Sequence, residues 1–144
     1  MSSRKSHPNI IRVGLVGSRS YENRRKIKDT IYKLTLKFGC DNLEIVSGGC
    51  PHGADKYAKK YALELQCHYK EFNPSHTQKN FYSAMPDRFY EKPYHVQNFF
   101  HRNKFLAKYV DYLIAFIPEG IESKGTLHTV KQAKTFGKNV VIVT

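Results

Sequence analysis

Short apolar runs alternate along the chain with segments of helical periodicity, and few folds accommodate that order. Residues 10–17 form a nearly continuous β-branched run, which is typical of a strand buried on both faces of a parallel sheet. Downstream, Ile27, Ile31 and Leu34 recur at helical spacing, and Gly39 ends the predicted helix. The same alternation predicts further strands at 43–46, 67–72, 112–117 and 140–143, and further helices at 54–65, 96–109 and 126–136.

Repeated strand-to-helix units of this kind predict an α/β fold. The expected architecture is a doubly wound, mainly parallel five-stranded sheet with helices on both faces and right-handed crossovers. With 144 residues, the chain is long enough for one hydrophobic core and too short for two. We therefore expect a flexible N-terminus at 1–9 and a single domain at 10–144.

A long polar segment interrupts the alternation at about 73–95. It is rich in Pro, Asn, Ser and His and is longer than an ordinary strand-to-helix connection, so we expect an excursion beside the functional site. Aromatic residues interleaved with Lys and Arg are concentrated in the wider stretch 72–109. These side chains either cover a hydrophobic edge or a contact in a homo-oligomer, or they stack on a ligand whose phosphates the cations hold.

Positive charge is in excess: 24 Lys and Arg against 12 Asp and Glu give a net charge of +12. Such a surface attracts phosphorylated small molecules and nucleic acid alike, so charge alone identifies neither partner. The alternative interpretation is a solvated basic surface without a specific partner.

Membrane, disulfide and metal proteins are disfavoured. No apolar stretch approaches the ~20 residues that cross a bilayer, and the polar N-terminus lacks the apolar region of a signal peptide, so we expect a soluble cytoplasmic protein without a membrane partner. Cys40, Cys50 and Cys67 lack the spacing of a zinc site or a disulfide framework. We expect no metal and no resident cofactor, and note that Cys50 lies in one of the turns described next.

Three predicted strand-to-helix turns are built from Gly and small polar residues. In a parallel sheet all three lie at the carboxyl edge, where unpaired N–H groups of the following helices can hold an anion. The first and fourth strands should be neighbours where the strand order reverses, which brings the first turn beside the third. Tight turns that require positive φ are the alternative explanation of any single glycine. The turns are Gly17-Ser18-Arg19, Ser47-Gly48-Gly49 with Gly53-Ala54-Asp55, and 120–126, which follows Pro118.

Individual polar residues at these turns have both a binding and an ordinary interpretation. Arg19 is either a bidentate partner of phosphate or carboxylate, or a solvated surface residue. Ser18 and Ser47 are hydroxyl donors or turn caps. Asp55 either interacts with the dipole of its helix, or accepts a ribose hydroxyl or orients Arg102.

Two polar residues of the predicted helix at 96–109 are also candidates. Asn103 shares an inward stripe with Phe99 and Leu106, and a buried amide needs a hydrogen-bond partner. Its neighbour Arg102 projects about 100° away along the helix, toward the expected mouth of the crevice.

The order and spacing of these motifs, together with the Gly125-Thr126 turn, resemble the SLOG superfamily of Rossmann-like proteins, and most closely its small YspA-like branch. The resemblance runs over about 11–143 and implies a nucleotide or nucleotide-derived ligand, such as an ADP-ribose-like molecule, in the Gly-rich crevice. The residues expected to bind it are Gly17, Ser18, Arg19, Ser47, Gly48, Gly49, Gly53, Asp55, Arg102, Asn103, Pro118, Gly125 and Thr126.

Relatives in that superfamily include the Lonely Guy phosphoribohydrolases and the DprA-like proteins that bind single-stranded DNA. The Lonely Guy motif Gly-Gly-x-Gly-Thr-x-x-Glu ends in a Glu that assists glycosidic cleavage, whereas here the corresponding position is Thr129. Glu119 and Glu122 are the remaining carboxylate candidates for catalysis, and each can equally be an ordinary loop residue. Arg102 is a further catalytic candidate. His128 is a candidate for acid–base chemistry or a surface histidine.

The sequence therefore predicts a protein that binds a nucleotide-like ligand as a sensor, sequestering protein or accessory domain. Two alternatives stay open, which are a phosphoribohydrolase that cleaves an N-glycosidic bond and a protein that binds single-stranded nucleic acid through its basic surface.

Overall fold

Five parallel strands form the single sheet of the protein. The computed structural model describes residues 10–144, so the flexible terminus predicted at 1–9 lies outside the described residues. The strand order is β3-β2-β1-β4-β5, and every neighbouring pair is parallel. The strands are β1 (Ile11–Gly17), β2 (Leu43–Ser47), β3 (His68–Glu71), β4 (Tyr112–Phe116) and β5 (Asn139–Val143). The predicted doubly wound α/β class is thus confirmed.

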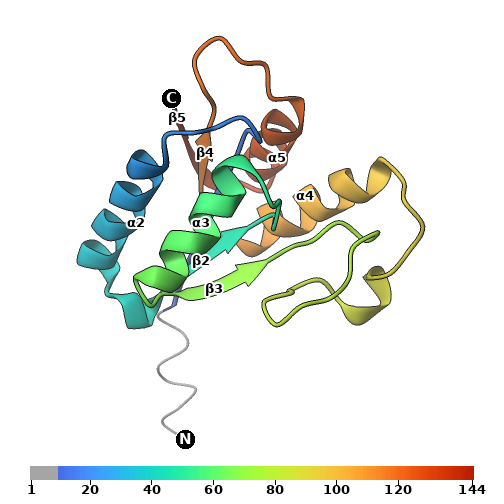
Figure 1. Ribbon diagram of the computed structural model, residues 1–144, viewed down its shortest axis with the longest axis horizontal. Helices are drawn as coiled ribbons and strands as arrows, with labels where there is room; N and C mark the ends of the chain where they lie inside the picture. The colour runs from blue at the N-terminus through green and yellow to red at the C-terminus, as the bar shows by residue number, and fades with distance from the viewer. Residues whose placement is uncertain (1–9) are drawn as a thin grey trace, which may run out of the picture.

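Helices cover both faces of this sheet (Figure 1). The pair α2 (Arg24–Phe38) and α3 (Gly53–Glu64) packs on one face, and the pair α4 (Gln97–Tyr109) and α5 (Lys124–Thr135) packs on the other. Single 3-10 turns, η2 (Cys40–Asn42) and η3 (Asp87–Phe89), lie in the connections. None of the helices in 10–144 is long and apolar enough to cross a membrane.

Helix α2 begins earlier than the apolar periodicity indicates. Asn23 caps it by accepting a hydrogen bond from the Lys26 amide at 3.2 Å, and the three residues between this cap and Ile27 are all basic. Its end is as predicted, because Gly39 has φ of +82° and stops the helix.

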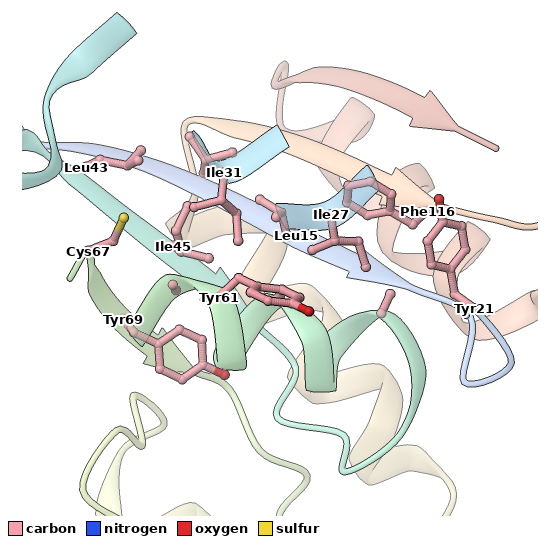
Figure 2. Close-up of a cluster of buried hydrophobic side chains, with 14 residues drawn as sticks. Leu15, Tyr21, Ile27, Ile31, Leu43, Ile45, Tyr61, Cys67, Tyr69 and Phe116 are labelled. Atoms are coloured by element: carbon pink, nitrogen blue, oxygen red, sulfur yellow. The ribbon is translucent and has the colours of Figure 1, made fainter. Parts of the chain in front are cut away.

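Two hydrophobic clusters, one on each face of the sheet, lie between the strands and the helices. On the α2 and α3 face, Leu15 and Ile45 from the central strands meet Ile27 and Ile31 from α2, as Figure 2 shows. On the opposite face, Leu106 of α4 packs with apolar residues of the sheet and of α5. Since the central strands are buried on both faces, their near-continuous apolar sequence is explained.

The segment 73–95 is tied to the edge strand β3 by an isolated β-bridge between Glu71 and Ser83 and by a buried polar network. The Glu71 carboxylate accepts hydrogen bonds from Tyr69 Oη, Asn73 Nδ2 and Asn80 Nδ2 at 2.8, 2.9 and 2.6 Å. Asn73 Oδ1 in turn accepts from Tyr90 Oη at 3.1 Å. Part of the aromatic content of this region therefore has the packing role that the sequence left open, since Tyr90 is buried.

The strand order reverses between β1 and β4. These neighbours are paired from Val13 with Tyr112 to Gly17 with Phe116, which confirms the predicted adjacency of the first and fourth strands. The Ser18 amide continues the pairing by donating to the Phe116 carbonyl at 3.0 Å. Loops that leave the carboxyl ends of β1, β2 and β4 consequently meet at one edge, where open α/β sheets bind ligands.

Candidate ligand-binding site

A cavity of about 370 Å³ opens at this switch point. Its volume lies in the range of small-molecule sites, roughly 300–1,000 Å³. The wall comes from the loops after β1 and β2, from α4 and from the start of α5. It consists of Val16, Gly17, Arg19, Gly48, Cys50, Asp55, Val96, Phe99, Phe100, Arg102, Asn103, Leu106, Ser123, Lys124, Gly125, Thr126 and Thr129.

The N-terminus of α5 forms one side of the cavity. The first helical hydrogen bond of α5 is donated by the Leu127 amide to the Ser123 carbonyl at 2.9 Å. The amides of Gly125 and Thr126, which precede it, therefore have no helical partner. Gly125 and Thr126 line the cavity, and a Cβ placed on Gly125 would meet no atom within 4 Å. The helix therefore presents unpaired N–H groups and its positive dipole end to an open space.

Cations and aromatic rings surround that helix end. Arg19 and Lys124, both exposed, stand at the wall, and the Arg19 guanidinium carbon lies 5.7 Å from the centre of the Phe99 ring. Phe99, Phe100 and Val96 supply an apolar surface on α4. Positive charge beside an aromatic face is suited to an anion attached to a flat heterocycle.

Arg102 holds the loop after β2 in place. Its Nη1 donates to the carbonyls of Gly48 and of Phe72, the latter at 3.1 Å, and its Nε donates to Asn103 Oδ1 at 2.8 Å. Most of its donors are thus engaged by the protein. The expected position at the cavity is correct, and the guanidinium organises the wall there instead of extending freely from its mouth.

Gly48 lies between Arg102 and Asp55, where any side chain would displace these two groups. A Cβ at this position would lie 2.5 Å from Arg102 Nη1 and 2.7 Å from Asp55 Oδ2. The Asp55 carboxylate also accepts a hydrogen bond from the Cys50 amide at 3.3 Å. Burial raises the pKa of Asp55 to about 6, although the positive charge of Arg102 partly offsets this shift.

Asn103 connects α4 to the start of α5. Its Nδ2 donates to the Gly125 carbonyl at 3.3 Å and lies 3.3 Å from His128 Nδ1. The buried amide predicted to need partners therefore has them. His128 packs against Phe100 with ring centres 4.7 Å apart, and it is not part of the cavity wall.

Five residues that the sequence assigned to ligand binding lie outside the wall, and for four of them the structure shows the reason. Ser18 Oγ accepts from the Ser20 amide at 3.1 Å and so caps its own turn. Ser47 is fully buried, with its Oγ 2.6 Å from Tyr69 Oη. Gly53 has φ of +67° and packs against the Ser18 carbonyl. The remaining two are Gly49, which faces Asn73 and Glu71, and Pro118 in the loop after β4.

The carboxylates proposed for catalysis are also outside the cavity. Glu119 and Glu122 are exposed in the loop between β4 and α5, and neither lines the cavity. Thr129, at the position of the Lonely Guy Glu, lines the cavity and donates its hydroxyl to the Gly125 carbonyl at 3.2 Å. Asp55 is the single carboxylate among the described residues of the wall.

Most wall residues missed by sequence reasoning lie on α4 and in the first turn of α5. Phe99 and Leu106 shared the inward stripe of Asn103, and a polar residue on an apolar stripe was the signal that this face borders a site. Ser123 and Lys124 were missed because the helix was expected to begin two residues later. Within 10–144, no three His, Cys, Asp or Glu side chains lie close enough together to hold a metal ion.

The fold and the cavity together define a class, which is a Rossmann-like α/β protein with a basic cavity at the switch point of its sheet. Solved structures with this fold include the molybdenum cofactor binding protein from the phototrophic bacterium Rippkaea orientalis. It has a TM-score of 0.68 and 18% sequence identity, over 92% of this chain and 76% of that one.

The Moco carrier protein from Chlamydomonas reinhardtii is similar as well. One of its structures has a TM-score of 0.62 and 17% identity over 93% of this chain and 76% of that chain. A second structure of that protein has a TM-score of 0.59 and 20% identity over 92% of this chain and 76% of that chain. Identities this low establish the shared fold alone. No family model matches the sequence, and no curated protein matches it.

Proposed function

We propose that the protein binds and sequesters a phosphorylated small molecule in the cavity at the switch point. The observation that carries this proposal is the open N-terminus of α5, where Gly125 and Thr126 face the cavity with unpaired amides. Arg19 and Lys124 add positive charge at the same side. A helix N-terminus flanked by cations is suited to phosphate.

The rest of the wall suits the remainder of such a ligand. The phosphate would lie against the Gly125 amide, and a heterocycle would lie along Phe99 and Val96, where it gains apolar contact. Asp55 and Asn103 supply polar groups between these two regions. An apolar surface combined with fixed polar groups is typical of sites that set the orientation of one ligand.

Two ligands are candidates. A nucleotide or ADP-ribose-like molecule is the ligand implied by the SLOG-like motif order of this sequence. The molybdenum cofactor is the alternative, favoured by the fold shared with proteins that are named as its carriers. In both cases the proposed role is binding and sequestering.

The cavity favours binding over hydrolysis. Cleavage of a glycosidic bond ordinarily uses two carboxyl groups on opposite sides of the bond. Asp55 is the single carboxylate in the described wall, and the place of the Lonely Guy Glu is taken by the Thr129 hydroxyl. Release of free base from a nucleotide by the purified protein would contradict this part of the proposal.

Thermal unfolding with a ligand panel tests the proposal. The panel contains AMP, ADP, ADP-ribose and, under anaerobic conditions, the molybdenum cofactor. A true ligand at a hundredfold excess over its Kd stabilises the fold by about 2.7 kcal/mol, which corresponds to roughly 5–10 °C for a chain of this size. If no phosphorylated compound in the panel raises the melting temperature, the proposal is wrong.

A pair of variants assigns the binding to the cavity. Arg19→Ala removes an exposed cation from the wall, and we expect it to weaken binding about tenfold, as loss of one charge-assisted hydrogen bond does. Arg25→Ala removes the same charge from the exposed side of α2 and should leave the affinity unchanged. Equal losses in both variants would indicate nonspecific attraction to the basic surface.

A further inference from the structure

Helix α3 and the loop at 77–83, together with Lys28 of the neighbouring α2, carry a cluster of Lys and aromatic side chains outside the cavity. We refer to it as the α3 basic face, and α3 lies beside α2 on its face of the sheet (Figure 1). We propose that this face binds single-stranded nucleic acid, as a second site independent of the cavity ligand. Its members are Lys28, Lys56, Tyr57, Lys59, Lys60, Phe81 and Tyr82.

Charge is the first argument. Helix α2 carries Arg24, Arg25, Lys26, Lys28, Lys33 and Lys37 against the single acid Asp29. Helix α3 adds Lys56, Lys59 and Lys60, and one of its two acids, Asp55, is buried at the cavity. A polyanion lying over these two helices would meet almost no opposing negative charge.

The positive charge is only partly neutralised within the protein. Lys28 Nζ lies 3.9 Å from Glu64, and Lys59 Nζ lies 3.4 Å from the buried Glu71. In the part of the chain that the structure describes, neither Lys56 nor Lys60 has a carboxylate oxygen within 4.0 Å. These two ammonium groups, both on exposed residues, are available to phosphates.

The aromatic residues are the second argument, and they favour single strands over duplex. Phe81 is 91% exposed, so packing within the chain does not account for it. Its ring meets Tyr82 edge-on at 5.2 Å, and Lys59 Nζ lies 5.1 Å from the Tyr82 ring centre. Aromatic faces among cations stack unpaired bases while the cations hold the backbone. A duplex hides its base faces and would use the charges alone.

The α3 basic face is separate from the cavity. None of its seven members contributes to the cavity wall, although α3 contributes Asp55 from its first turn. Lys56 and Lys60 are one helical turn apart on the exposed side, whereas Ala54, Ala58 and Ala62 are buried against the sheet. A ligand in the cavity and a strand on this face can therefore be bound together.

Fluorescence anisotropy with a labelled dT20 strand and a 20-bp duplex tests the proposal. We expect tighter binding of the single strand, and Phe81→Ala should weaken it at least about fivefold without changing the salt dependence. Lys56→Ala with Lys60→Ala should weaken binding about tenfold and reduce the slope of log K against log salt by about 1.4, since each phosphate contact contributes ~0.7.

Matched controls lie elsewhere on the molecule. Lys131→Ala with Lys134→Ala removes the same charge from the exposed side of α5, and Ile142→Ala removes an exposed apolar side chain from β5, the sheet edge opposite β3. Both should retain wild-type affinity for dT20. Equal affinity for single strand and duplex, no effect of Phe81→Ala, or equal losses in the α5 control would each overturn the proposal.

Discussion

At the scale of single residues, the charge of the cavity at neutral pH depends on Asp55. It is the wall residue whose carboxyl is buried, and Gly48 separates it from the compensating guanidinium of Arg102. Burial raises its pKa to about 6, so this group changes charge close to physiological pH. Protonation of Asp55 removes the one negative charge of the described wall, and an anionic ligand benefits from that loss.

The raised pKa of Asp55 predicts that stability falls as pH rises. Between about pH 3.9, the ordinary pKa of an Asp carboxyl, and about pH 6, the folded protein binds more protons than the unfolded chain. The free energy of unfolding therefore decreases by up to about 3 kcal/mol over this range and is constant above it. Asp55→Asn should flatten this part of the profile in urea unfolding. Asp29→Asn, on exposed α2, is the control, and a profile unchanged by Asp55→Asn would contradict the assignment.

Gly125 offers a test that separates stability from binding. Because nothing lies within 4 Å of its Cβ position, Gly125→Ala should be accepted without strain and should stabilise α5 by up to about 1 kcal/mol. Because Gly125 lines the cavity where we propose that the phosphate binds, we expect ligand affinity to fall at least about tenfold. Thermal unfolding and calorimetric titration measure the two effects.

Gly137 is the matched control for that substitution. It also has an empty Cβ position, but its φ of +75° is strained for any residue with a side chain. Gly137→Ala should therefore destabilise the fold by about 1 kcal/mol and leave ligand affinity unchanged. A Gly125→Ala variant that binds as tightly as the native chain would show that the phosphate lies elsewhere.

Sequence patterns predicted which turns meet but not what each residue does there. Arg102 and Asn103 could be placed at the site because a polar residue on an inward helical stripe needs partners. Ser47 could not be distinguished from a binding residue, because its partner Tyr69 is 22 positions away in the sequence and meets it only after the strands pair. Such long-range partners decide whether a polar group is free for a ligand.

At the scale of elements, the Glu71 carboxylate adds side-chain hydrogen bonds to the backbone bridge that attaches the segment 73–95 to β3. Although burial alone would raise the pKa of Glu71, hydrogen bonds from Asn80, Asn73 and Tyr69 lower it below the usual carboxyl value. Ionised Glu71 therefore stabilises the fold at pH values above the ordinary pKa of a Glu side chain. This stabilisation is lost as the pH falls through the lowered pKa of Glu71 in the folded protein.

Glu71→Gln tests that attachment. The amide group of Gln would place a donor against the donors of Asn73, Asn80 or Tyr69, so we expect a loss of about 1–3 kcal/mol. Hydrogen exchange should become faster within 73–95 before it does so in the central strands. The exposed Glu64→Gln on α3 is the control, and uniform acceleration over all strands would contradict a local role for Glu71.

Element positions were predictable where apolar periodicity reached the ends of the element. All five strands and four main helices were predicted in order. Helix α2 begins at Arg24 and α5 at Lys124, earlier than expected, because the residues before Ile27 in α2 and before Thr126 in α5 are charged residues or glycine and carry no apolar signal. The attachment of 73–95 was not predictable, since it depends on polar contacts between residues of β3 and a loop without periodicity.

At the scale of the whole molecule, the net charge of +12 opposes compaction. Much of this charge lies on α2 and α3, where cations are close to one another and few acids intervene. Self-repulsion of this kind is screened by salt, with a Debye length of about 8 Å at physiological ionic strength. The basic surface thus carries a cost in stability that a bound polyanion would relieve.

Salt should therefore stabilise the free protein. Raising NaCl from about 20 mM to about 150 mM is expected to increase the melting temperature by a few degrees, because repulsion among the Lys and Arg side chains is screened. The α2 and α3 charges dominate this effect, so Lys56→Ala with Lys60→Ala should reduce it. A melting temperature that falls with added salt would show that favourable ion pairs outweigh the repulsion.

The most direct measurement is a titration of the ¹⁵N-labelled protein with inorganic pyrophosphate, the diphosphate group that ADP and ADP-ribose contain, followed by amide NMR signals. We expect the signals of Gly125 and Thr126, at the open start of α5, to shift saturably and further than those of Lys56 and Lys60 on the α3 basic face. Saturable shifts confined to other parts of the chain, or none at about 10 mM in the folded protein, would contradict this expectation.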